Sequence, residues 1–245
     1  MTTSPQSIDY GREFERAGTL LSQNWIIALP TAVASLAVLF LVIIPVAAFV
    51  VGSIVSLGTM HAAGLPFVGI GFLGVIGGFL AATLVSIIAH AAVIRAAADA
   101  WEGRPVQLAT ALTAAFARLP ALVVAALAIL ILLIIPIALS FIFIGIPLIF
   151  VVWYLLIFTL PAIMLDNQNG FDAISTSFRI TTRQVGPSLV AAIGIWVVMI
   201  VAHVIGGVIG HIPLLGWLAF FAIGGLAQAY AALVSARFYT LLRAL

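Results

Sequence analysis

Residues 119–165 read LPALVVAALAILILLIIPIALSFIFIGIPLIFVVWYLLIFTLPAIML and contain no charged side chain. A helix needs about 20 apolar residues to cross the hydrocarbon core of a bilayer, so this interval holds two crossings and a short turn. Its first part, residues 121–139, includes thirteen Leu, Ile or Val residues. Each of these favours insertion by roughly 0.3–0.6 kcal/mol, whereas one central Arg or Asp would cost about 2.5–3.5 kcal/mol. The interval therefore predicts a transmembrane hairpin.

Two further uncharged intervals, 17–94 and 184–236, flank this one and predict two crossings each. Only 7% of the residues are charged, against about 25% in an ordinary soluble domain. We therefore expect an all-α polytopic membrane protein with six transmembrane helices arranged as three hairpins. The predicted spans are 25–51, 72–94, 120–140, 146–165, 187–209 and 214–236, with a cytoplasmic amphipathic segment over 1–24 and a cytoplasmic tail over 237–245.

The charged residues fall into four blocks, within 9–16, 95–118, 166–183 and 237–243. With two crossings per interval, all four blocks lie on one side of the membrane. The loops on the other side contain no Arg, so the positive-inside tendency predicts that the blocks and both termini are cytoplasmic. The expected location is the cytoplasmic membrane, as a multi-pass protein. The polar start, which carries both charge signs, predicts no cleavable signal peptide.

Residues 52–71 are the ambiguous part of the first interval, because they combine several Gly and Ser residues with Pro66. This composition is typical of an outer loop or a shallow re-entrant segment. A seventh crossing here would place the later charged blocks outside, so we disfavour it.

Three cytoplasmic segments have apolar residues at near-helical spacing, and each precedes an odd-numbered crossing. Their apolar residues are Ile8, Phe14, Ala17 and Leu21; Leu108, Leu112, Ala115, Phe116 and Leu119; and Phe171, Ile174, Ser175 and Phe178. Such segments are typical of lead-in helices that lie in the headgroup plane. The chain is then either three repeats of one plan, or a bundle whose inner loops simply touch both lipid and water.

Small residues point to close helix packing. Gly74 with Gly78, and Gly206 with Gly210, have the G-x-x-x-G spacing, which lets helix backbones approach closely in a membrane. Packing inside one bundle is the preferred interpretation. The predicted partner is the lipid bilayer. Association with another membrane protein, or with further copies of this chain as a homo-oligomer, is left as an alternative.

Composition and motifs exclude several function classes. A net charge of +2 is too small for a nucleic-acid-binding protein. The sequence has no Cys and no H-E-x-x-H, G-x-S-x-G or Walker-type motif, so we predict no catalytic residue, no metal site and no cofactor. Asp99 and Glu102 lie one helical turn apart, but Arg95 and Arg104 flank them, which favours an ion-pair cluster over acid–base chemistry.

Polar groups within the predicted spans are few. His90, His203 and Gln228 are the candidates for ligand binding or transport, because an intramembrane polar group of this kind is a functional-site hypothesis by default. His203 is expected toward the outer half and His90 near the inner end, so we expect them at different depths. Gln228 could approach His90 if the second and sixth helices touch. The alternative is that each group only bonds a neighbouring helix.

The third charged block has a physical interpretation as an elbow between helices. Pro161 is expected to bend the fourth helix, and Asn169–Gly170 to supply a left-handed helix stop. Asp172 would favour the start of the next helix. The residues of this elbow motif are Pro161, Asp166, Gly170, Asp172, Ser177 and Arg179, with Arg179 and Arg183 expected to face lipid phosphates.

The same block carries a family resemblance. The stretches Pro161–Asp166, Gly170–Ile174 and Ser177–Thr181 resemble a signature of the membrane domain attached to some glycerophosphodiester phosphodiesterases and of its stand-alone prokaryotic relatives. Residues 97–103, followed by Leu108 and Leu112, resemble that family's middle cytoplasmic loop. The resemblance implies six helices. It does not imply phosphodiesterase activity, which belongs to a separate soluble domain of those enzymes.

Three functions follow as hypotheses. The leading one is a non-catalytic integral membrane protein that acts as a scaffold or accessory partner. The alternative is a small transporter or channel for an apolar or lipid-like solute, which would use His90, His203 and Gln228. The third, an intramembrane enzyme, requires a water-filled cavity with converging polar side chains.

Overall fold

The fold is described from a computed structural model, which covers residues 8–59, 65–212 and 215–244. Within these ranges almost every residue is helical and no β-strand occurs. In chain order the helices are α1 (Tyr10–Gln23), η1 (Trp25–Ala28), α2 (Leu29–Thr59), α3 (Leu65–Trp101), α4 (Leu108–Ala117), α5 (Leu119–Leu139), η3 (Ser140–Ile142), α6 (Gly145–Leu156), α7 (Thr159–Asp166), α8 (Gly170–Arg183), α9 (Val185–Ile209) and α10 (Leu215–Leu242), where η marks a 3₁₀ helix. The predicted all-α fold is confirmed.

Six stretches in the described ranges are long and apolar enough to cross a membrane. They are Trp25–Ile54, Gly71–Trp101, Leu119–Leu139, Gly145–Asp166, Val185–Ile209 and Gly216–Leu242. Their number agrees with the prediction, and the fourth stretch is built from two helices, α6 and α7. The chain is therefore a multi-pass membrane protein.

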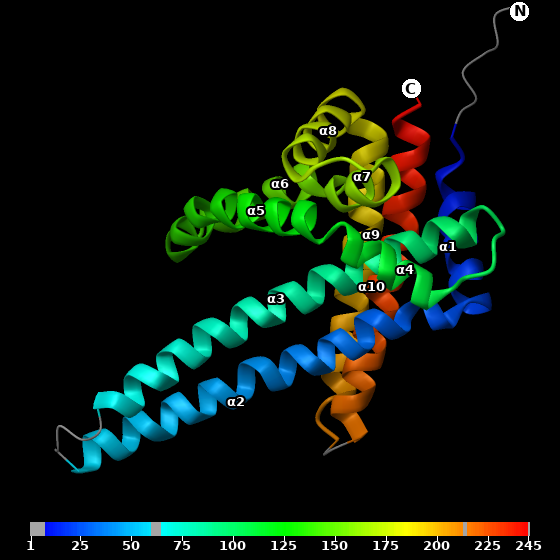
Figure 1. The fold of residues 1–245 in the computed structure, drawn as a ribbon. Coiled ribbons are helices and arrows are strands. Elements are labelled where there is room, and N and C mark those ends of the chain that lie inside the picture. Colours follow the sequence, from blue (N-terminus) through cyan, green and yellow to red (C-terminus); the bar gives the residue numbers. More distant parts are fainter. Residues whose placement is uncertain (1–7, 60–64, 213–214, 245) are drawn as a thin grey trace, which may run out of the picture.

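The six stretches form three helix pairs, α2–α3, α5–α6 and α9–α10. Figure 1 shows the pairs leaving a common body in different directions. We call this body the hub, and it consists of α1, α4, α7 and α8 with the adjoining ends of α3 and α10. Helix α10 also packs against α2 and α3, so the first and third pairs meet along it.

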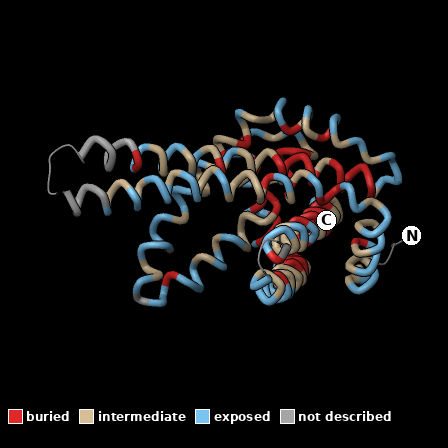
Figure 2. The backbone as a smooth tube through the Cα atoms, turned by 90° about the horizontal axis from the view of Figure 1, so that it is seen from below, coloured by how far each residue is buried: buried red, intermediate tan, exposed pale blue. Residues whose placement is uncertain are grey.

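Burial is concentrated in the hub and along α10, as Figure 2 shows. The far parts of the helix pairs instead expose large apolar side chains, such as Ile131 and Ile135 on α5 and Val208 on α9. Contiguous apolar surface of this extent is typical of contact with lipid rather than water. These faces are what a bilayer would cover.

The structure corrects the prediction for residues 52–71. Helix α2 continues to Thr59 and α3 begins at Leu65, so the described part of this stretch is helical rather than a loop or a re-entrant segment; residues 60–64 lie outside the described ranges. Gly and Ser lower helix propensity by only about 1 kcal/mol or less per residue. In lipid, where the backbone must satisfy its own hydrogen bonds, that cost does not end a helix. The pair is also tightly packed, because a Cβ on Gly78 would clash with the carbonyl oxygen of Leu41.

Two helices extend beyond their predicted spans into the hub. Helix α3 has 37 residues, which gives it a length of about 55 Å at 1.5 Å per residue. The hydrocarbon core is only about 30 Å thick, so α3 is longer than an untilted crossing requires. Helix α10 likewise continues to Leu242, with Phe238 and Tyr239 buried, so the predicted tail over 237–245 is instead largely the last part of this helix.

The three lead-in helices are present as α1, α4 and α8, each directly before a crossing. Protein covers the predicted apolar face of α1, but only part of that of α4, where Ala115 is buried and Phe116 is exposed. On α1, Ala17 is fully buried and the ring of Phe14 lies 5.6 Å from that of Phe238. On α8 the buried face holds Ala173, Ser177 and Ile180, whereas the predicted face points outward, with Phe171 68% and Phe178 51% exposed. The small face packs inward because it allows the close approach to α5 and α6 described below.

Candidate intramembrane binding site

The predicted elbow begins with a break in the fourth crossing, between α6 and α7. Pro161 is the third residue of α7, and it cannot donate a hydrogen bond to the carbonyl of Ile157. Ser177 of α8 satisfies the backbone around the break: its hydroxyl accepts from the N–H of Phe158 at 3.1 Å and donates to the carbonyl of Leu155 at 2.7 Å. A single buried hydroxyl thus replaces the helical bonds lost at the break.

The other end of α7 departs from the predicted elbow. The left-handed residue is Asn167, with φ 57°, and not the Asn169–Gly170 pair. Asn169 instead caps α8, because its side chain accepts from the N–H of Asp172 at 2.9 Å. The expected place of Asp172 in the first turn of α8 is confirmed. Asn can adopt the left-handed conformation without a glycine, which is why the stop lies three residues earlier.

Gly170 has a packing role. A Cβ on this residue would lie 2.7 Å from both the carbonyl oxygen of Ala121 and the nitrogen of Ala125. The first residue of α8 therefore touches the backbone of α5, and any side chain here would push the two helices apart. Arg179 lies on the exposed side of α8, where a headgroup phosphate could reach it.

The four charged blocks meet in the hub. Glu13 of α1 accepts two hydrogen bonds from Arg237 of α10, at 2.8 and 3.0 Å. Asp166 accepts from the hydroxyl of Tyr239 at 2.5 Å and pairs with Arg243. Arg118 bonds Asn167 across the second and third blocks. The predicted ion-pair cluster is confirmed as well, since Arg95 and Arg104 both pair with Asp99, and Arg104 also pairs with Glu102.

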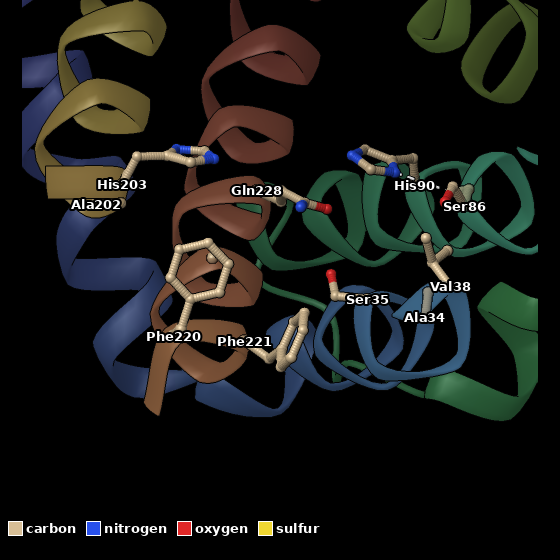
Figure 3. Close-up of a pocket in the computed structure, with 11 residues that line it drawn as sticks. Ala34, Ser35, Val38, Ser86, His90, Ala202, His203, Phe220, Phe221 and Gln228 are labelled. Atoms are coloured by element: carbon tan, nitrogen blue, oxygen red, sulfur yellow. Dashed lines mark hydrogen bonds between the residues drawn. The ribbon is translucent and has the colours of Figure 1, made fainter. Parts of the chain in front are cut away.

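The predicted intramembrane candidates lie together. A cavity of about 250 Å³ between α2, α3, α9 and α10 is lined by His90, His203 and Gln228, together with Ser35 and Ser86. Figure 3 shows His203, Gln228 and His90 in a row, each from a different helix. His90 and His203 therefore border one cavity, although their sequence positions had suggested different depths. The divergence of the helix pairs accounts for the difference, because depth cannot be counted along helices that are not parallel.

A larger cavity of about 490 Å³ lies beside the first, between the three helix pairs and α7. Most of its lining is apolar, from residues such as Ile129, Leu133, Val152 and Met199. Its polar lining residues are Ser86, His90, Thr159, Gln228 and Ser235. Its size falls within the usual range of small-molecule sites, about 300–1,000 Å³.

The two cavities adjoin at Ser86, His90 and Gln228, which line both. On α10 the lining residues follow one stripe at steps of three or four: Phe221, Gly224, Gln228, Ala231 and Ser235. At about 1.5 Å per residue this stripe is about 21 Å long, roughly two-thirds of the hydrocarbon core. We call the two cavities together the path.

Hydrogen bonding leaves several groups of the path available. Nδ1 of His90 lies 2.9 Å from the Ser86 carbonyl, and Nδ1 of His203 lies 2.7 Å from the Met199 carbonyl. A carbonyl only accepts, so Nδ1 carries the proton and Nε2 of each neutral ring is an acceptor. Gln228 has no hydrogen-bond partner among the described residues. The hydroxyl of Thr159 is buried and equally without a partner there.

Sequence reasoning did not select four polar residues of the path as candidates: Ser35, Ser86, Thr159 and Ser235. Ser235 could have been found from its spacing of seven residues, two helical turns, after Gln228. The position of Thr159 beside the larger cavity depends on the break before α7. In the described part of the chain, no group of three or more His, Asp or Glu side chains could hold a metal ion.

The predicted packing glycines have different roles. Gly78 faces α2, and a Cβ on Gly206 would lie 2.9 Å from the Phe220 ring on α10. Gly74 makes only ordinary contact with Pro45. Gly210 caps the end of α9, and a Cβ there would meet the carbonyl of Gly206 in its own helix rather than a neighbouring one.

Comparison with known proteins finds no matching family model, no matching curated protein and no matching solved structure. The resemblance to the phosphodiesterase membrane domain therefore stays a prediction.

Proposed function

We propose that the protein is a non-catalytic carrier that binds an apolar or lipid-like molecule in the path and moves it within the membrane. The observation that carries this proposal is that two cavities adjoin at Ser86, His90 and Gln228. A largely apolar cavity with a few converging polar groups is the usual form of a small-molecule site. Here it opens between helix pairs that would be surrounded by lipid.

The contacts in the path favour binding over catalysis. The ring of His90 bonds the backbone carbonyl of Ser86, and no hydrogen bond joins the two side chains, so these residues do not form an activated nucleophile. The lining residues include no carboxylate. Binding and movement require only the hydrogen-bonding groups already present.

The scaffold role ranks second in this proposal. A scaffold needs free groups for its partner, whereas much of the hub's charge is used within the chain, as in the Glu13–Arg237 and Asp166–Arg243 pairs. We further propose that the hub lies on the cytoplasmic side of a prokaryotic cytoplasmic membrane, since it holds the arginines.

Filling the path tests the proposal. Gly224 and Gly207 are matched, because a Cβ on either meets nothing within 4 Å, yet only Gly224 lines the path. Ala231 of the path is likewise matched by the exposed Ala222 on the same helix. The probe is a long-chain alkyl diazirine, photolysed on the full-length protein in phosphatidylcholine nanodiscs.

We expect Gly224→Leu and Ala231→Phe to reduce labelling of α9 and α10 peptides severalfold, and Gly207→Leu and Ala222→Phe to leave it unchanged. Equal labelling of all four variants would mean that the probe only coats the lipid-facing surface, and the proposal would be wrong.

A further inference from the structure

The lining of the path restricts the charge of its ligand. Among the described residues no charged side chain lines either cavity, and Arg237 and Arg104 of the hub are paired with Glu13 and Asp99. If the ligand had an ionised polar head group, that group would lose its hydration in the path and meet no opposite charge there. The ligand's head must therefore be uncharged.

The available polar groups further define this head. Nε2 of His90 and Nε2 of His203 are acceptors in the neutral rings, as derived above from their bonds to backbone carbonyls. The amide of Gln228 can accept through its oxygen. A hydroxyl head, which both donates and accepts, satisfies these groups, whereas an acceptor-only head can bond the NH2 of Gln228 but leaves both Nε2 atoms without a donor.

Thr159 provides an independent observation at the hub end of the path. Its side chain is 1% exposed, and its hydroxyl has no hydrogen-bond partner among the described residues. Threonines in helices commonly donate to the carbonyl four residues earlier, as Thr83 and Thr113 do here. For Thr159 that carbonyl belongs to Leu155, which already accepts from Ser177. The hydroxyl of Thr159 is thereby left without a partner among the described residues, and the residue lines the larger cavity with its hydroxyl buried against the protein.

We propose that the ligand is an uncharged amphiphile with a hydroxyl head, which occupies one of two positions, at Ser86, His90 and Gln228 or at Thr159 at the hub end, with its apolar body in the larger cavity. This inference rests on the proposed function. It excludes phospholipids and ionised fatty acids as ligands.

The test compares three probes with the same alkyl chain and the same diazirine: an alcohol, a carboxylate at pH 8.5 and a hydrocarbon. Half-saturation of photolabelling is measured on the full-length protein in phosphatidylcholine nanodiscs. We expect the alcohol to bind at least tenfold more tightly than the carboxylate. Thr159→Val should weaken alcohol binding about three- to tenfold, the effect of one hydrogen bond, without changing that of the hydrocarbon. Thr159→Ser should restore it. The control is Thr83→Val, because Thr83 lines neither cavity and its hydroxyl donates to the Phe79 carbonyl.

Each alternative result is decisive. Carboxylate binding as tight as that of the alcohol would overturn the uncharged head while leaving a binding path in place. Equal weakening of alcohol and hydrocarbon by Thr159→Val would assign the residue a structural role and overturn its part in recognition. If the hydrocarbon fails to label and the filling variants at Gly224 and Ala231 have no effect, the proposed function itself is wrong.

Discussion

The hydroxyl of Ser177 lies between Phe158 and Leu155 and bonds the backbone of both, at 3.1 and 2.7 Å. It joins the amphipathic helix α8 to the point where the fourth crossing is interrupted. Replacing it would leave a buried N–H and a carbonyl without partners, and such groups cost about 1–3 kcal/mol.

We therefore expect Ser177→Ala to lower the free energy of unfolding by about 1–3 kcal/mol. The matched control is Ser175→Ala, on the exposed side of the same helix, which should change it by less than about 0.5 kcal/mol. The measurement is denaturant unfolding in detergent micelles. Equal effects of the two substitutions would contradict the role of Ser177.

A side chain at Gly170 should separate α8 from α5. We expect Gly170→Ala to destabilise the protein by about 1–3 kcal/mol, since its Cβ would lie 2.7 Å from backbone atoms that cannot move away individually. Gly186→Ala has open space around its Cβ and serves as the control. Thermal unfolding of both variants decides the question, and a lower melting temperature for the control alone would refute this contact.

The pair of Glu13 and Arg237 should hold α1 against α10. Their side chains are 18% and 28% exposed, so the pair is partly shielded from solvent. We expect Glu13→Gln to weaken the docking of α1 by about 1–2 kcal/mol, between the values of exposed and buried pairs. Trypsin cleavage after Arg16 should then accelerate several-fold, whereas Glu15→Gln, an exposed residue, should have no effect. An unchanged cleavage rate in Glu13→Gln would argue that the Glu13–Arg237 pair does not hold α1 against α10.

Single thiols can test the proposed orientation, because the sequence contains no cysteine. Phe143 and Ile212 are exposed in the connections α5–α6 and α9–α10, and Arg179 is exposed in the hub. In intact cells, a membrane-impermeant maleimide should label Phe143→Cys and Ile212→Cys but not Arg179→Cys. Labelling of Arg179→Cys alone would reverse the orientation, and labelling of all three would rule out the six-crossing arrangement.

The polar groups of the path should contribute jointly to transport. Replacing His90, His203 and Gln228 together by Leu should reduce transfer of a long-chain alcohol across proteoliposomes by about twentyfold, since hydrogen bonds inside membranes contribute about 0.6 kcal/mol each. His211→Leu, at the end of α9 and outside both cavities, is the control. Transfer at the wild-type rate in the triple variant would remove these residues from any transport mechanism.

The sequence predicted the crossings well because charge is so costly in a membrane. Arg95, Arg118 and Asp166 mark the limits of the uncharged intervals 17–94 and 119–165. The ends of the crossings could therefore be predicted from the positions of charged residues alone. The candidates His90, His203 and Gln228 were also found, because polar groups in apolar spans are conspicuous.

The packing of the helices against one another was less predictable from the sequence. Which face of α8 packs inward depends on Gly170 and Ser177 meeting α5 and α6, and apolar spacing alone assigned it to Phe171 and Phe178. The single cavity shared by His90 and His203 depends on the angles between helix pairs, which no local pattern encodes. The continuation of α2 to Thr59 and the start of α3 at Leu65 depend on the absence of water as a competing hydrogen-bond partner for the backbone.

The indole N–H of Trp101 donates to the carbonyl of Leu233 at 2.9 Å, which joins the last residue of α3 to α10. Leu233 lies between Ala231 and Ser235, two residues of the path. This hydrogen bond therefore fixes α3 against α10 at the hub end of the path. If the path widens to admit a ligand, we expect α6 and α7 to move, because the fourth crossing is already interrupted at Phe158 between them.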